Sequence, residues 1–223
     1  MTEGQPFIRF DWIADNLDEI AQRLGEHVLM VVAAVGIGFV VSFALAMVAR
    51  RWRFTYGPIL AVTGTLYAIP SLALFVLLIP ITGLTLTTGI VALVLYTLLI
   101  LVRNIVVALE GVPPDVVEAA TGMGYGPGQR FWRVELPIAL PVVVAGLRIA
   151  TVTTIGLVAI TTFIGLGGLG YLIINSGTRR FFPTSIYVGV LLCVLLAVLA
   201  DLALAWAQRR LTPWAGARAG QEP

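Results

Sequence analysis

Lysine is absent from this chain of 223 residues, and cysteine and histidine each occur once. Without lysine, the chain can hold neither a P-loop lysine nor a Schiff base, so it is not its own P-loop ATPase. The single histidine, His27, and the single cysteine, Cys193, are too distant in the sequence to predict a His/Cys metal cluster or a Cys-His nucleophile pair. We expect a packing role for Cys193, an interfacial role for His27, and no metal site or catalytic residue.

Charged residues are also scarce. They make up 12% of the chain, against about 25% in ordinary soluble domains, while 59% of residues are hydrophobic and the mean hydropathy is +0.97. The 49 residues between Arg53 and Arg103 carry no charge, and about 20 apolar residues cross a bilayer. These features exclude a soluble enzyme, a coiled coil, a disordered chain and a disulfide scaffold. The net charge of +2 comes from loop arginines and does not indicate a nucleic-acid partner.

The apolar runs predict an all-α integral membrane protein with about five transmembrane helices. Proline, glycine and arginine separate the runs, which predicts a transmembrane domain over residues 28–207 and a cytoplasmic tail over 208–223. The five predicted spans are 28–49, 57–79, 89–109, 142–164 and 186–207.

Residues 1–27 form a zone of different character. Ile13, Leu17, Ile20 and Leu24 recur at helical spacing between acidic residues, which predicts an amphipathic helix at the membrane interface. Packing of this helix against the protein's own spans is an equal alternative. We expect no cleavable signal peptide, because the first apolar run begins only at Val28 and is long enough to span.

The arginines predict the orientation. With five spans and the N-terminus outside, ten arginines lie on or near the cytoplasmic side and four lie outside. Cytoplasmic loops carry an excess of arginine and lysine. The sequence therefore predicts an outside N-terminus and a cytoplasmic C-terminus.

One predicted cytoplasmic loop, residues 110–141, is long and polar. Pro113 and Pro114 can begin a short helix, and a glycine-rich stretch over 122–128 ends it. Residues 129–136 can form a second short helix that we expect Pro137 to stop. Such a projecting pair of helices, with alanines on one face, is suited to docking into a groove of a partner protein.

The same loop carries a motif. Glu118-Ala119-Ala120 is followed after three residues by Gly124, and after nine more by Val134, one residue and Leu136-Pro137. This spacing resembles the EAA motif of the permease subunits of bacterial ABC importers, in which isoleucine is usual at the place of Val134. The resemblance implies that the loop forms a coupling helix, and that Glu118, Ala119, Ala120 and Gly124 contact or shape the contact with a separate ATP-binding subunit.

Within this family, residues 60–177 are similar to permeases for glycine betaine, carnitine and choline. The resemblance implies three further partners: a second permease copy or similar permease, an extracytoplasmic substrate-binding protein, and membrane lipid. It implies no cofactor, since ATP is bound by the separate subunit. The segments that carry the similarity are Tyr67 to Phe75, Leu101 to Asn104, Val134 to Pro141, and Phe163 to Gly170.

Two other functions stay open at this point. The first is a permease for an amino acid such as methionine, whose importer permeases share five spans and a glycine-rich end to span four. The second, from another class, is an ion-coupled secondary transporter. That function requires intramembrane carboxylates, and only Asp201 qualifies.

Two groups of residues within the spans carry further predictions. Pro70 and Ser71 interrupt span two beside Tyr67, so a kink there can line the transport pathway, with simple packing as the alternative. Asp201 lies at a depth similar to that of Arg148 and Arg103, and we expect it to pair with one of them as a structural strut.

Overall fold

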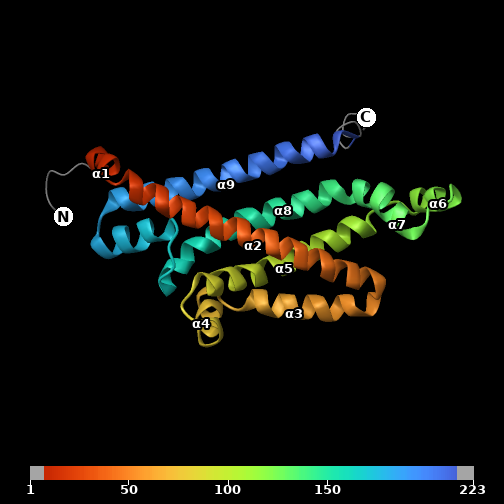
Figure 1. Ribbon diagram of the computed structural model, residues 1–223, viewed down its shortest axis with the longest axis horizontal. Coiled ribbons are helices and arrows are strands. Elements are labelled where there is room, and N and C mark those ends of the chain that lie inside the picture. Colours follow the sequence, from red (N-terminus) through yellow and green to blue (C-terminus); the bar gives the residue numbers. More distant parts are fainter. Residues whose placement is uncertain (1–7, 215–223) are drawn as a thin grey trace.

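The computed structural model describes residues 8–214, which form helices joined by short turns and contain no strand (Figure 1). Four helical segments in this range are long and apolar enough to cross a membrane, and a fifth is obtained if one bent pair counts as a span. The predicted all-α membrane fold is therefore confirmed. The α-helices are α1 (Phe10–Asp15), α2 (Leu17–Arg51), α3 (Tyr56–Ala68), α4 (Ser71–Thr82), α5 (Leu86–Glu110), α6 (Pro114–Gly122), α7 (Pro127–Arg130), α8 (Leu136–Val158) and α9 (Pro183–Leu211).

Helix α2 is longer than the predicted span 28–49. Its 35 residues extend about 52 Å, well beyond the roughly 30 Å of bilayer hydrocarbon. Residues 17–27 are therefore not a separate interfacial helix, because no proline interrupts the helix between them and the span. Their apolar face packs on the protein itself, where Ile20 is buried with Leu169 and Leu172. Residues 1–7, and 215–223 of the predicted tail, lie outside the described range.

The predicted second span, 57–79, is not one kinked helix. Helices α3 and α4 meet at 101°, and the two residues between them, Ile69 and Pro70, have extended backbone conformations. Pro70 supplies no N–H to continue the helix. The hydroxyl of Tyr96 on α5 donates a hydrogen bond to the carbonyl of Ile69, so the break is held by a side chain from another helix.

Span four begins much earlier than predicted. Helix α7, a π-helical turn at Phe131–Glu135 (η2), α8 and the 3-10 turn η3 (Ala159–Ile164) run as one continuous helical segment over Pro127–Ile164. Pro137 does not stop it; this residue directly follows the π turn, at the start of α8 and inside the continuous segment. The predicted cytoplasmic loop and the predicted span are thus mechanically continuous.

Helix α5 lies at the centre and packs on α2, α3, α4 and α8, whereas α9 lies along the outside of α8 (Figure 1). The segment between α8 and α9 folds into short helical turns, among them η4 (Leu172–Gly177). Helices α6 and α7 project at one end of the molecule, which we call the loop end, while α1 and η4 lie at the opposite end.

Candidate functional site

The loop end carries the predicted partner-binding residues on α6. Glu118 and Ala119 are exposed, but Ala120 is 1% exposed. Ala120 therefore packs against the protein's own helices in the single chain. Of the two predicted roles, contacting a partner or shaping the contact, its burial leaves the second, which stays a prediction. On a short helix packed along one side, neighbouring alanines point in directions about 100° apart, so only one of the pair remains free.

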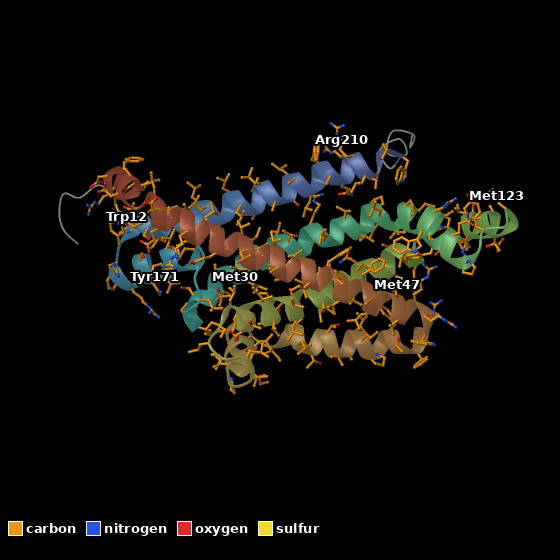
Figure 2. The ribbon with its side chains drawn as sticks, viewed as in Figure 1. Trp12, Met30, Met47, Met123, Tyr171 and Arg210 are labelled. Atoms are coloured by element: carbon orange, nitrogen blue, oxygen red, sulfur yellow. The ribbon has the colours of Figure 1, made fainter. Side chains whose placement is uncertain are left out.

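Two large apolar side chains extend the exposed surface of the loop end. Met123 is 70% exposed and Trp132 is 63% exposed, and Figure 2 shows Met123 at the tip of the projection. Exposed apolar groups gathered beyond the membrane-spanning bundle indicate a protein partner.

Gly124 forms the turn that ends α6. Its φ of +85° lies in the left-handed region that favours glycine. The N–H of Gly124 donates to the carbonyl of Thr121 (3.0 Å), and the N–H of Tyr125 donates to that of Ala120 (3.1 Å). The motif residues Val134, Leu136 and Pro137 are half-buried in η2 and the start of α8, behind this turn.

Glu135 is a residue that the sequence analysis missed. It is 1% exposed, and its carboxylate accepts hydrogen bonds from Arg50 on α2 and from Nε of Arg130 on α7 (2.8 Å for the latter). Arg130 also donates to the hydroxyl of Thr121 on α6 (3.0 Å). A lone acid that closely follows Arg130 and Arg133 in the sequence was a signal, but its burial depends on the π turn.

Beside this cluster lies a cavity of about 430 Å³. Its lining includes Arg50, Tyr56, Val117 and Glu135, so it opens between α2, α3, α6 and η2. A second ion pair on its rim joins Arg53 and Glu110 at 3.4 Å, with both side chains more than half exposed.

The break between α3 and α4 holds the predicted pathway residues. Tyr67 and Pro70 are exposed and Ser71 is half-buried. The ring of Tyr67 lies edge-on to that of Tyr96, with 5.7 Å between centroids. Beside the helix break, Tyr67 and Pro70 are thus accessible in the single chain, and Ser71 is partly accessible.

Of the two partners predicted for Asp201, the structure has Arg148. Nε and Nη2 of Arg148 each donate to the carboxylate at 2.8 Å. The pair is only partly buried, since the side chains are 31% and 35% exposed. Arg103 is exposed on α5 and takes no part in this pair.

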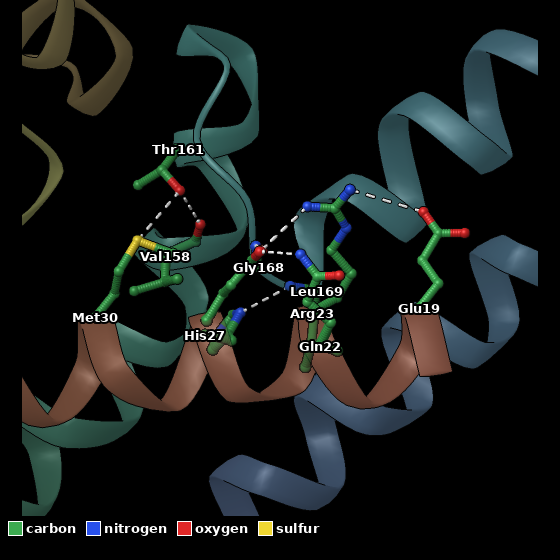
Figure 3. A network of polar contacts seen from close by, with 10 residues as sticks. Glu19, Gln22, Arg23, His27, Met30, Val158, Thr161, Gly168 and Leu169 are labelled. Carbon is green, nitrogen blue, oxygen red and sulfur yellow. Dashed lines mark hydrogen bonds and ion pairs between the residues drawn. The ribbon is translucent and has the colours of Figure 1, made fainter. Parts of the chain in front are cut away.

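A polar cluster at the opposite end fastens the glycine-rich segment to α2 (Figure 3). Glu26 accepts a hydrogen bond from the N–H of Gly168 (2.9 Å) and pairs with Arg23 (3.1 Å). The Nδ1 of His27 accepts from the N–H of Leu169 (3.2 Å), which leaves Nε2–H to donate to the carbonyl of Ile155 (3.0 Å). His27 is fully buried, so its predicted interfacial role is wrong.

The sequence of this chain matches a known family. Residues 35–213 match the model of the "Binding-protein-dependent transport system inner membrane component". The match covers most of the chain, which therefore belongs to this family of membrane transport permeases. This membership places the chain outside the ion-coupled class of transporter.

Two curated relatives extend over nearly the whole chain. The chain is 36% identical to the glycine betaine/carnitine/choline transport system permease protein OpuCD of Bacillus subtilis, over 91% of this chain and 88% of the relative. It is 37% identical to the osmoprotectant import permease protein OsmW of Salmonella typhimurium, over 91% of this chain and 96% of the relative.

A solved structure has the same fold. It is that of the MetNI methionine ABC transporter in an inward-facing conformation, with a TM-score of 0.78, 26% identity, and coverage of 86% of this chain and 96% of the other.

Proposed function

We propose that this chain is the permease subunit of an ABC importer that moves a small quaternary-ammonium osmolyte, of the glycine betaine, choline or carnitine class, into the cytoplasm. The observation that carries the proposal is the identity of 34–37% to three permeases named for osmoprotectant or choline transport. The chain itself makes and breaks no bond and binds no cofactor, because ATP is bound and hydrolysed on a separate subunit.

The ATP-binding subunit docks on the loop end, where Glu118, Ala119 and the turn at Gly124 present an exposed surface. Movement of that surface passes into the membrane through the continuous helical segment Pro127–Ile164. A second copy, or a similar permease, completes the pathway. The substrate-binding protein docks at the opposite end, which holds α1 and the glycine-rich segment.

The pathway runs past the break between α3 and α4. Tyr67 and Pro70 are exposed there in the single chain, and Ser71 is half-buried. The face of a tyrosine ring attracts a quaternary ammonium ion, so Tyr67 suits transient contact with the cargo. Selection among osmolytes belongs to the substrate-binding protein.

Uptake by the reconstituted complex tests this function. The chain is purified with its ATP-binding subunit, placed in vesicles with the binding protein, and supplied with radiolabelled glycine betaine, choline or methionine. ATP-dependent uptake of a quaternary ammonium compound supports the proposal. Uptake of methionine alone would assign the chain to the amino-acid class that its structural neighbour represents.

A further inference from the structure

The cluster around Glu135 joins the end of α2 to the continuous helical segment that holds α7 and the π turn, 85 positions away in the sequence. Arg50 lies in the last turn of α2, Arg130 ends α7, and Glu135 closes the π turn between α7 and α8. The carboxylate uses one oxygen for each guanidinium group. Because the carboxylate is almost fully buried, the two arginines replace the water it has lost, and charge-assisted hydrogen bonds of this kind are roughly twice as strong as neutral ones.

The cluster reaches the docking helix through one more bond. Nη1 of Arg130 donates to the hydroxyl of Thr121, which directly follows the motif alanines on α6. A continuous polar chain therefore leads from α6 through Arg130 and Glu135 to Arg50. The exposed surface that meets a partner and the end of a transmembrane helix are tied to one buried carboxylate.

The π turn sets the direction in which Glu135 points. A π turn holds one more residue than an α turn, and each residue of an α-helix rotates the side chain by about 100°. In a regular α-helix Glu135 would therefore leave the face that meets Arg50. Single π turns occur frequently at functional sites.

The far end of α2 is fastened to the same helical segment. Glu26 and His27 bind Gly168, Leu169 and Ile155, which lie at and beyond the end of α8 (Figure 3). Helix α2 is thus held to the segment that contains α8 by polar contacts at both ends, with apolar packing between them. A displacement of the loop end is passed to α2 and α8 together.

We propose that Glu135 is a positioning residue for ATP-driven transport: by binding Arg50 and Arg130 it makes α6, α2 and α8 move as one unit. This rests on the proposed function in that an ATP-binding subunit docks on α6. We call these contacts of Glu135 with Arg50 and Arg130 the clamp. Without the clamp, the ATP-binding subunit still docks and hydrolyses ATP, but its movement no longer reaches the transmembrane helices.

The first test is the ratio of glycine betaine transported to ATP hydrolysed by the reconstituted complex. Glu135→Gln keeps the shape of the side chain and removes its charge. We expect the ratio to fall about tenfold, as for loss of a typical coupling between two sites, while ATP hydrolysis continues. Arg53→Gln is the matched control, because it removes a nearby arginine whose pair with Glu110 is exposed. An unchanged ratio in Glu135→Gln would overturn the proposal.

The second test does not depend on the cargo. After Cys193→Ala, spin labels are placed on cysteines at Met123, on the loop tip, and at Val48, on the exposed face of α2. The distance between the labels in the assembled complex should be narrowly distributed in the parent protein and in Arg53→Gln, and broad in Glu135→Gln. If Glu135→Gln fails to assemble, Arg50→Gln breaks the same contact from a partly exposed position. A narrow distance in the assembled variant contradicts the clamp, whereas ATP hydrolysis without uptake by the parent contradicts only the proposed cargo.

Discussion

Arg148 and Asp201 form a two-pronged ion pair between α8 and α9, in which Nε and Nη2 each lie 2.8 Å from a carboxylate oxygen. The planar guanidinium matches the carboxylate, so the pair fixes the relative direction of the two helices as well as their distance. Little else of helix α9 is buried, since only 6% of its most apolar stretch of 18 residues is buried in the single chain. The pair is therefore a principal polar attachment of α9 within the apolar zone.

Substitution of one partner should loosen this attachment. In Asp201→Leu the arginine remains without its carboxylate in an apolar setting, which is unfavourable. We expect a lower thermal unfolding temperature for the purified protein and faster proteolysis near α9. The double variant Arg148→Leu with Asp201→Leu should be more stable than Asp201→Leu alone, because no charge is then left unpaired. Equal stability of the parent protein, Asp201→Leu and the double variant would show that the pair does not hold α9.

The sequence predicted this pair because depth in a membrane is readable from helix position, and two charges at one depth tend to find each other. It also predicted short helices in the loop after α5, and about five spans, of which the structure has four and one bent pair. The angle at Pro70 was not predictable in this way. A proline predicts a kink but not its angle. The bend of 101° is held by a hydrogen bond from the hydroxyl of Tyr96 to the carbonyl of Ile69, and these two residues are 27 positions apart in the sequence.

The directions of the side chains around the π turn could not be predicted from the sequence either. The direction of Glu135 depends on one extra residue in a helical turn, and no local pattern marks it. The same holds for Ala120, since which alanine of the pair is buried depends on how α6 lies against the rest of the chain. Helix ends also moved: Pro137, which we expected to end a helix, lies directly after the π turn inside the continuous segment Pro127–Ile164.

The two motif alanines should respond differently to the same substitution. Ala119 is exposed and Ala120 is buried, so Ala119→Glu should leave folding intact and prevent association with the ATP-binding subunit. Ala120→Glu places a carboxylate in a buried site and should lower the yield of folded protein. Co-purification with the ATP-binding subunit, together with thermal unfolding of the permease alone, separates the two effects. Identical behaviour of the two variants would argue against this burial pattern.

Gly124 should tolerate no side chain. Its positive φ costs a residue with a Cβ about 1–2 kcal/mol, although no atom lies within 4 Å of the place such a Cβ would occupy. Gly124→Ala should therefore reshape the turn without steric clash and reduce transport-linked ATP hydrolysis. Gly128→Ala is the matched control, since Gly128 lies on α7 with equal space and no positive φ. A stronger defect in the Gly128 variant would refute the conformational argument.

Loss of His27 should weaken the opposite end. His27→Ala leaves the N–H of Leu169 and the carbonyl of Ile155 without the partner they have now. A buried polar group that loses its partner costs about 1–3 kcal/mol. We expect lower thermal stability and faster hydrogen exchange at the Leu169 amide. Gln22→Ala removes an exposed bond to Glu26 and should change neither; unaltered exchange at Leu169 in His27→Ala would exclude the histidine as its acceptor.

The orientation of the chain can be tested with two cysteines in a Cys193→Ala background. Phe10 lies on α1 at the opposite end and is 75% exposed, and Met123 lies at the loop end and is 70% exposed. An excess of arginines on the side of the loop end predicts that this side is cytoplasmic. In intact cells an impermeant maleimide should therefore label Phe10→Cys and not Met123→Cys, and both should react after the membrane is opened. Labelling of Met123→Cys alone in intact cells would reverse the orientation, and the ATP-binding subunit could not then dock on α6, because ATP is supplied from the cytoplasm.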